Sequence, residues 1–281
     1  MYNPVMQAPH VNLSAEAASF WAELAEHGIH RVAEGLSHAE TVAMTEEFGT
    51  HNYHPLPVTI VRGQGSYAWD SEGKRYIDCV GSYSAMSHGH LSEAVIQTAR
   101  KQLGSLTLTS RAVYTRELAV FLKALCLYTE MDMACPMNTG AEAVETAIKL
   151  ARKWAYKVKG IPRDRAEILV ADNNFHGRTT TIVGFSSEDQ YRDGFGPFTP
   201  GFSLIPFSDI DALANAITPD TAAVLMEPIQ AEAGILIPPD GYMEGVRRLC
   251  SEHDVLLIWD EIQTGFCRTG RKFAWQYEDA A

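Results

Sequence analysis

A run of five apolar residues, Val255 to Trp259, leads directly into the acidic pair Asp260-Glu261. An unbroken apolar run without alternation indicates a strand buried on both faces, as in a parallel sheet. A carboxylate at the carboxyl end of such a strand lies where open α/β sheets bind their ligands. Because an unpaired buried charge is costly, we expect Asp260 to face a cation, a metal or a protonated ring nitrogen.

Three interpretations of this segment compete. A Walker B strand would look the same, but it requires a phosphate loop, and the only Gly-Lys pair, Gly73-Lys74, lacks the Ser or Thr that must follow. That interpretation is excluded. The strand could end in a merely solvated Asp260. Alternatively, Asp260 could face the protonated pyridine ring of a cofactor, with Gln263 within reach of a ring hydroxyl.

The composition is that of an ordinary globular protein. The chain has 281 residues, 46% hydrophobic and 21% charged, which is enough for one or two domains. A net charge of −12 argues against a nucleic-acid partner. No apolar run reaches the length of a membrane span. The five scattered cysteines suggest reduced thiols, and the acidic N-terminal region is unlike a transit peptide, so we expect a cytoplasmic protein.

Hydrophobic periodicity predicts an α/β sheet with crossover connections. Residues 14–48 are expected to be helical, and residues 51–57 form an extended segment broken by proline. Further helices are expected at Ser92–Leu103, Thr115–Leu127, Gly140–Lys159, Ile210–Ile217 and Tyr242–His253. Strands are expected at Val58–Val61, Tyr67–Asp70, Arg75–Cys79, Met131–Met137, Glu167–Ala171, Phe202–Pro206, Ala222–Met226 and Val255–Trp259.

One predicted helix begins with the features of a phosphate site. Thr139 and Glu142 have the spacing of a capping box. Gly140 and Ala141 carry almost no side chain, which leaves their amides open at the positive end of the helix. A well-capped helix without a ligand is the alternative.

Two further segments place polar groups directly after predicted strands. Phe175 and His176 follow one strand, and Arg178 offers a two-pronged partner for a substrate carboxylate. An aromatic side chain at this point can stack on a flat cofactor. Glu227 and Glu232 follow the next strand, at the same expected edge of the sheet. Taken alone, the first segment is better explained as an ordinary surface loop. The same alternative is weaker for the second segment, because two separate strands then end in acids at one edge of the sheet.

Other motifs are excluded. The Gly63-x-Gly65 pair mimics a dinucleotide fingerprint, but strand-like residues follow it where a helix must open. The pair His51 and His54 lacks the accompanying ligands of a metal site, so no metal is predicted. No nucleophile elbow of the G-x-S-x-G type occurs.

Four motifs in order, T-G-A-E-A, F-H-G-R, E-P-I-Q-A-E-A-G and D-E-I-Q-T-G, resemble those of the class III, fold-type I aminotransferases, which use pyridoxal 5′-phosphate. The resemblance runs from about His51 to the last residue. It implies a mostly parallel sheet flanked by helices and a homodimer. Residues 1–62 would form an N-terminal helical segment with part of a small domain, and residues 63–281 the large cofactor-binding domain.

The resemblance also implies roles for individual residues. Asp260 would keep the ring nitrogen protonated, while Phe175 stacks on the ring. The cofactor site would comprise Thr139, Gly140, Ala141, Phe175, His176, Glu227, Asp260 and Gln263. The substrate site would comprise Tyr53 and Tyr83 in the pocket for the amino donor, Arg178 at the α-carboxylate, and Glu232 paired with a more C-terminal arginine.

The implied reaction moves the δ-amino group of ornithine to 2-oxoglutarate. The Schiff-base lysine of the family follows D-E-I-Q-T-G and is expected beyond Ala281, so we expect a C-terminally shortened chain without catalytic activity. Lys272 lies too close to Asp260 to replace it. The alternatives are another ω-amino acid or acetylornithine aminotransferase, and a non-catalytic cofactor-binding homologue.

Overall fold

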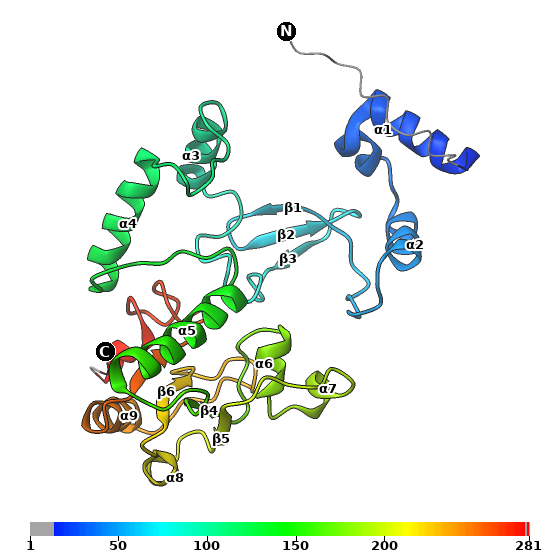
Figure 1. Cartoon of the computed structure of the whole chain (residues 1–281). Helices are drawn as coiled ribbons and strands as arrows, with labels where there is room; N and C mark the ends of the chain where they lie inside the picture. The colour runs from blue at the N-terminus through cyan, green and yellow to red at the C-terminus, as the bar shows by residue number, and fades with distance from the viewer. Residues whose placement is uncertain (1–13, 279, 281) are drawn as a thin grey trace. The chain divides into compact units, whose positions relative to one another are not determined.

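The computed structural model describes residues 14–278 and 280, and these fall into two compact units (Figure 1). The first unit comprises Met1–Cys79 with His88–Arg100, and the second comprises Val80–Ser87 with Lys101–Ala281. The predicted boundary at residue 62, between the N-terminal segment and the large cofactor-binding domain, stays a prediction. None of the described helices is long and apolar enough to cross a membrane.

The first unit begins with two helices where the sequence predicts one helical region. Helix α1 (Ala15–Glu34) and helix α2 (His38–Phe48) are separated at Ser37. Ser37 forms a capping box with Glu40: the Glu40 amide donates to Ser37 Oγ at 3.2 Å, and the Ser37 amide donates to Glu40 Oε2 at 2.9 Å. This local signal starts a new helix and outweighs the continuing helical pattern.

A three-stranded antiparallel sheet follows in the order β1-β2-β3. Its strands are β1 (Ile60–Gln64), β2 (Tyr67–Asp70) and β3 (Arg75–Ile77). Strand β1 continues through Gly63, two residues past the predicted strand end at Val61. Glycine is needed there because an added Cβ would lie 2.5 Å from the ring of His90.

The second unit is built on four parallel strands in the order β5-β4-β6-β7, which confirms the predicted α/β class. The strands are β4 (Glu167–Ala171), β5 (Phe202–Ile205), β6 (Thr221–Met226) and β7 (Leu256–Trp259). All six residues of β6 are buried. Since the strands are parallel, the segments that follow β4, β6 and β7 emerge at one edge of the sheet.

Helices cover both faces of this sheet. Helix α5 (Gly140–Trp154) packs Val144, Ile148 and Ala151 against one face and continues as a π-helical turn over Ala155–Lys159. Helices α8 (Ile210–Ala216) and α9 (Tyr242–Glu252) pack against the other face. The remaining elements are α3 (Glu93–Leu103), α4 (Arg116–Thr129), α6 (Thr180–Gly184), α7 (Asp189–Arg192) and a 3₁₀ turn (Ala274–Tyr277).

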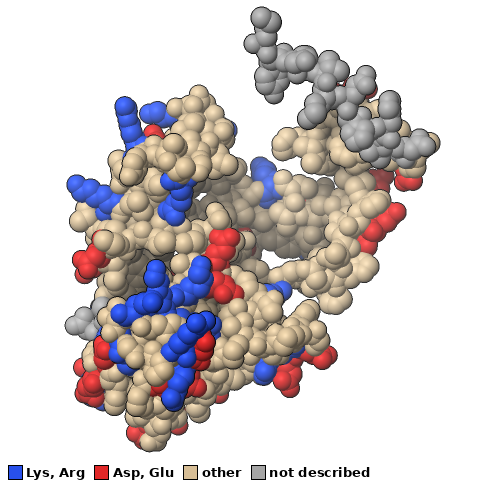
Figure 2. Space-filling view, viewed as in Figure 1, with Lys and Arg blue, Asp and Glu red and all other residues tan. Residues whose placement is uncertain are grey.

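The charges of α5 complement its dipole. Glu142 lies in the first turn, whereas Arg152 and Lys153 lie in the last. Lys and Arg side chains gather over α5 and its continuation on the face shown in Figure 2. Acidic groups at the amino end and basic groups at the carboxyl end of a helix lower its free energy. These charges therefore stabilise helix α5 itself.

One strand prediction is wrong and a second is wrong in part. Residues 131–137 form no strand, because a strand needs a ladder partner and none of the described residues bonds to this segment in a sheet. Strand β7 exists as predicted, but Leu256–Trp259 are half-buried and not buried on both faces. The reason is that β7 is an edge strand of the described sheet.

Lys159 ties the amino-terminal ends of two strands together. Its Nζ donates to the carbonyl oxygens of Thr221 at 2.9 Å, His253 at 3.1 Å and Asp254 at 2.7 Å. Thr221 begins β6, and the other two residues immediately precede β7. The three carbonyls therefore share one cation at the end of the sheet opposite Asp260.

Candidate functional site

The segments that follow β4, β6 and β7 enclose a cavity of about 210 Å³ with the amino end of α5. The acids Glu227 and Asp260 directly follow β6 and β7. The cavity is lined by Gly140, Ala141, Phe175, His176, Gly177, Glu227, Ile229, Asp260, Ile262, Gln263 and Thr264. Seven of the eight predicted cofactor residues thus meet in one place, although they are drawn from four separate stretches of sequence.

The eighth predicted residue, Thr139, caps helix α5. Its hydroxyl accepts from the Glu142 amide at 3.1 Å, and it lines an adjoining, mostly apolar cavity of about 490 Å³. The second hydrogen bond of the predicted capping box, from the Thr139 amide to the Glu142 side chain, is replaced by another. Glu142 Oε2 accepts from the amide of Asn138 at 2.8 Å, one residue before the cap. Gly140 and Ala141 remain at the amino end of the helix, facing the first cavity.

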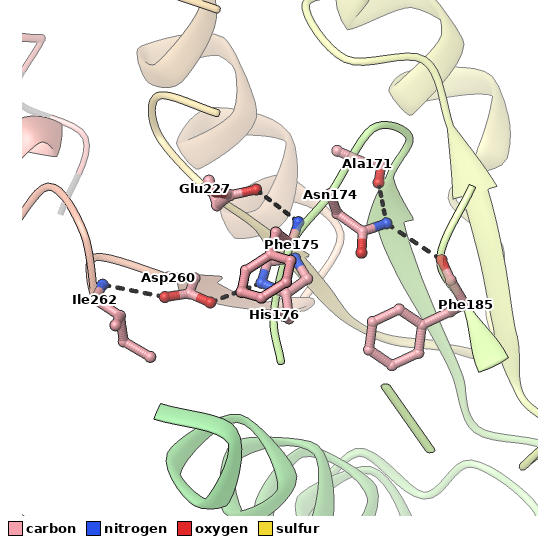
Figure 3. Close-up of polar contacts among 8 residues, drawn as sticks. All are labelled: Ala171, Asn174, Phe175, His176, Phe185, Glu227, Asp260 and Ile262. Carbon is pink, nitrogen blue, oxygen red and sulfur yellow. Dashed lines mark hydrogen bonds and ion pairs between the residues drawn. The ribbon is translucent and has the colours of Figure 1, made fainter. Parts of the chain in front are cut away.

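Hydrogen bonds hold the loop after β4 in place. Asn174 Nδ2 donates to the carbonyls of Ala171 at 2.7 Å and Phe185 at 3.2 Å (Figure 3). The amide of Phe175 donates to Glu227 Oε2 at 3.1 Å. Because these groups are buried or partly buried, each bond fixes the loop that presents Phe175 to the cavity.

Asp260 is buried and pairs with His176 rather than with a lysine or arginine. Its Oδ2 lies 2.7 Å from His176 Nδ1, and its Oδ1 accepts from the amide of Ile262 at 3.1 Å (Figure 3). Only 8% of Asp260 and 3% of His176 are exposed. Asp260 is therefore a buried acid with both oxygens oriented by the protein, beside an open cavity.

Glu227 lies deeper in the same site. Burial raises the pKa of Glu227 to about 7 from its ordinary 4.5, while the nearby His176 and the Phe175 amide act in the opposite direction. The folded protein therefore binds a proton on Glu227 that the unfolded chain releases between these two pH values. Glu227 favours folding below pH 4.5, and this contribution is lost as the pH rises through about 7.

Replacing Glu227 with Gln is expected to flatten the dependence of stability on pH. Gln can still accept from the Phe175 amide, but it carries no charge to desolvate. Between pH 4.5 and 7 the unfolding free energy of the unmodified protein should fall by up to about 3 kcal/mol from this group. Urea unfolding at several pH values measures the effect. Parallel curves for Glu227→Gln and the unmodified protein would contradict it.

The predicted substrate residues do not meet at one cavity in the way that the predicted cofactor residues do. Gln263 Nε2 donates to Glu232 Oε1 at 2.9 Å, so these two residues are neighbours. The guanidinium carbon of Arg178 lies 5.8 Å from the centre of the Phe175 ring, outside the cavity lining. Tyr83 is 62% exposed and does not line the cavity. Tyr53 belongs to the other compact unit.

Four lining residues were not predicted: Gly177, Ile229, Ile262 and Thr264. Ile262 is 54% exposed although it is apolar and follows a buried acid. Its position inside D-E-I-Q was the available signal. Gly177 has a φ of +122°, and a Cβ there would lie 2.8 Å from the Cβ of Ala141. Glycine thus permits the loop after β4 to approach the amino end of α5.

None of the described residues that line this cavity is a lysine. Lys272 Nζ forms an ion pair with Glu130 at 3.0 Å and lies 5.3 Å from the centre of the Tyr128 ring. These contacts hold Lys272 away from the residues that line the cavity.

The chain matches a known family over most of its length. The family model described as Aminotransferase class-III matches residues 48–281. A curated ornithine aminotransferase from Brevibacillus brevis is 52% identical over 238 residues, 85% of this chain and 60% of that relative. One from a Geobacillus species is 50% identical over 240 residues, with the same coverage.

Solved structures give the same result. An ornithine aminotransferase from Toxoplasma gondii has a TM-score of 0.87 and 40% identity, covering 89% of this chain and 60% of that one. An acetylornithine aminotransferase from Elizabethkingia anophelis has a TM-score of 0.77 and 46% identity, covering 87% and 60%. The chain therefore spans about 60% of the length of these relatives.

The parallel sheet, the flanking helices and the order of the four motifs are those of the class III aminotransferases. The chain belongs to the class III aminotransferase family. The family predicted from the four motifs is confirmed.

Proposed function

We propose that the cavity beside Asp260 binds pyridoxal 5′-phosphate, and that the whole protein transfers the δ-amino group of L-ornithine to 2-oxoglutarate. The products are glutamate 5-semialdehyde and L-glutamate. The observation that carries the proposal is the convergence of α5, the loop after β4, and the ends of β6 and β7 on one cavity. A helix amino end, an aromatic ring and a buried carboxylate suit a phosphorylated, cationic heterocycle.

The residues fit this cofactor. The amino end of α5 provides amides and a positive dipole end for the phosphate, with Gly140 and Ala141 at the cavity. Asp260, buried at the carboxyl end of β7, lines the same cavity and provides the negative charge for a protonated ring nitrogen. Phe175 lines the same cavity and offers a flat surface for the ring.

When bound, pyridoxal phosphate supplies an electron sink for the negative charge left at a substrate carbon. Asp260 would hold the proton at the ring nitrogen, and Gln263 would contact the ring hydroxyl. Phe175 would stack on the ring and exclude water. A general acid/base must still move the proton at the substrate carbon, a task that a lysine performs in this family. Because no described lysine lines the cavity, we expect the 281-residue chain to bind the cofactor without efficient turnover.

The cofactor proposal is tested with pyridoxine 5′-phosphate, which has no aldehyde and cannot react with surface lysines. Equilibrium dialysis should reveal one saturable site for which pyridoxal phosphate competes. Borohydride treatment of the chain loaded with pyridoxal phosphate, followed by peptide mapping, should show no preferred adduct. A single adduct at Lys272 that accompanies turnover would contradict the proposed arrangement.

The amino donor is tested by supplying a base from solution. Methylamine is added to the loaded chain with either L-ornithine or N-acetylornithine, and the pyridoxamine phosphate formed is quantified. We expect ornithine to react faster than it does with pyridoxal phosphate alone, and faster than N-acetylornithine. The opposite preference would favour an acetylornithine aminotransferase, the second candidate, which the 46% identity to the Elizabethkingia anophelis enzyme supports.

Tyr53 and Tyr83 would line the pocket for the amino donor, with Arg178 at the α-carboxylate and Glu232 holding an arginine.

The proposal also includes a homodimer and a cytoplasmic location. The free cysteines of the described chain suit a reducing compartment. Sedimentation of the purified protein tests the homodimer, and fractionation of its source cells tests the location.

A further inference from the structure

We propose that Tyr191, on the short helix α7, is a positioning residue for Arg178 and thereby favours amino donors that carry a carboxylate. Tyr191 acts through Arg178, because its ring holds the guanidinium group beside the loop that presents Phe175 to the cavity. The inference rests on the proposed function, in which Arg178 binds the α-carboxylate of the amino donor.

Three contacts join the side chains of Phe175, Arg178 and Tyr191. The guanidinium carbon of Arg178 lies 5.6 Å from the centre of the Tyr191 ring and 5.8 Å from the centre of the Phe175 ring. The two rings meet edge to face, with centroids 6.4 Å apart and an interplanar angle of 72°. Arg178 is exposed, whereas both rings are partly buried. The cation therefore contacts two aromatic rings that also contact each other.

A guanidinium group held in this way keeps its capacity to bind a carboxylate. The attraction between a cation and an aromatic ring uses the charge of the guanidinium and none of its N–H donors. A long side chain loses conformational freedom when it binds a ligand, and a ring that restrains Arg178 beforehand reduces this loss. The planar group of Arg178 is therefore preorganised for two parallel hydrogen bonds with a carboxylate.

The segment that carries Tyr191 is itself held on both sides. Before α7, Ser187 Oγ accepts from the amide of Asn173 in the loop after β4 at 2.7 Å. At the end of α7, the guanidinium carbon of Arg192 lies 5.2 Å from the centre of the partly buried Phe198 ring. Because α7 is fixed against its surroundings, the ring of Tyr191 is a stable support for the cation.

The two rings have different tasks. Phe175 lines the cavity, where it would stack on the cofactor, whereas Tyr191 does not line the cavity. Removing Phe175 would therefore disturb the cofactor and Arg178 together. Removing Tyr191 takes away a ring that contacts the cation without facing the cavity. The variant of Tyr191 is for this reason the one that tests the support of Arg178.

The role of Tyr191 is measured with two synthetic conjugates of pyridoxal phosphate, each a stable secondary amine. One conjugate carries L-ornithine joined through its δ-nitrogen, and the other carries putrescine, which lacks the carboxylate. The ratio of their dissociation constants reports the contribution of the carboxylate, and any effect on the shared cofactor part cancels. We expect the unmodified chain to prefer the ornithine conjugate by at least about tenfold.

Tyr191→Ala is expected to lower this preference by about fivefold, whereas Tyr191→Phe, which keeps the ring, should retain it. Tyr67→Ala is the matched control. It removes a tyrosine of strand β2 whose ring centre lies 4.6 Å from the guanidinium carbon of Arg75, and the preference should not change. An unaltered preference in Tyr191→Ala, or equal losses in the Ala and Phe variants, would overturn the role of Tyr191.

The two proposals fail in different ways. Unaltered preference in Tyr191→Ala, with normal preference in the unmodified chain, would overturn the role of Tyr191 alone. Equal affinities of the unmodified chain for the two conjugates would overturn the assignment of Arg178, and with it the role of Tyr191. No binding of either conjugate or of pyridoxine 5′-phosphate would overturn the proposed function as a whole. Circular dichroism spectra confirm that each variant remains folded before affinities are compared.

Discussion

Replacing Asp260 with Asn is expected to weaken binding of pyridoxine 5′-phosphate by about 100-fold, or roughly 3 kcal/mol. The substitution keeps the size of the side chain but removes the charge that would face the cationic ring. Asp260 is largely shielded from water, since only 8% of it is exposed, and a charge-assisted bond is stronger there than at the surface.

The fold should tolerate this change. Asn can still accept from His176 Nδ1, so the unfolding free energy should change by no more than about 1 kcal/mol. Asp211→Asn is the matched control: it removes the same charge from an exposed residue in the first turn of α8, and the affinity should not respond. Affinity in Asp260→Asn that stays close to that of the unmodified chain would contradict the assignment of this carboxylate.

Replacing Gly177 with Ala is expected to lower the unfolding free energy by about 3–5 kcal/mol and to abolish cofactor binding. Two costs add. A φ of +122° is a region that residues other than glycine rarely adopt, and the new Cβ would lie 2.8 Å from the Cβ of Ala141. To relieve this contact, the loop that carries Phe175 and His176 must move away from α5.

The contact can be separated from the backbone strain. Gly160 has a φ of +85°, but no heavy atom lies within 4 Å of the Cβ that Ala would add. Gly160→Ala should therefore cost only about 1 kcal/mol and leave binding unchanged. Denaturant unfolding and equilibrium dialysis of both variants give the comparison. Equal effects of the two substitutions would show that the close approach to Ala141 has no consequence.

Much of the fold could be predicted because the signals were local. The apolar runs that became β4, β6 and β7 were correct within a residue or two. Helix α5 was predicted from its cap and its periodicity, including its extension to Lys159. In each of these elements, propensity, capping and hydrophobic pattern agree, and such agreement makes a segment predictable.

Features set by distant partners could not be predicted. Residues 131–137 are mostly apolar but include Pro136 and no β-branched or aromatic residue, and a ladder also requires a second strand, which a single segment does not reveal. The half-buried state of β7 likewise depends on what lies at its outer edge. The acceptor of the Asn138 amide was missed because the standard capping box links Glu142 to Thr139.

The candidate site shows the same division. The motifs identified most of the residues that line the cavity, because residues after parallel strands must share an edge. The pairing of Asp260 with His176 joins residues 84 positions apart and has no local signal. Ile262 was overlooked because an apolar residue is usually assigned to the core, and only the structure shows that Ile262 is exposed and lines the cavity.

Lys159 has a consequence for chemistry that takes place at the far end of the sheet. Side chains alternate between the faces of a strand, so sliding β7 by one residue against β6 would turn Asp260 away from His176. By clamping the carbonyls of Thr221, His253 and Asp254, this ammonium group fixes the alignment of the two strands where they begin. The orientation of Asp260 in the cavity thus depends on Lys159, a cation at the opposite end of the sheet.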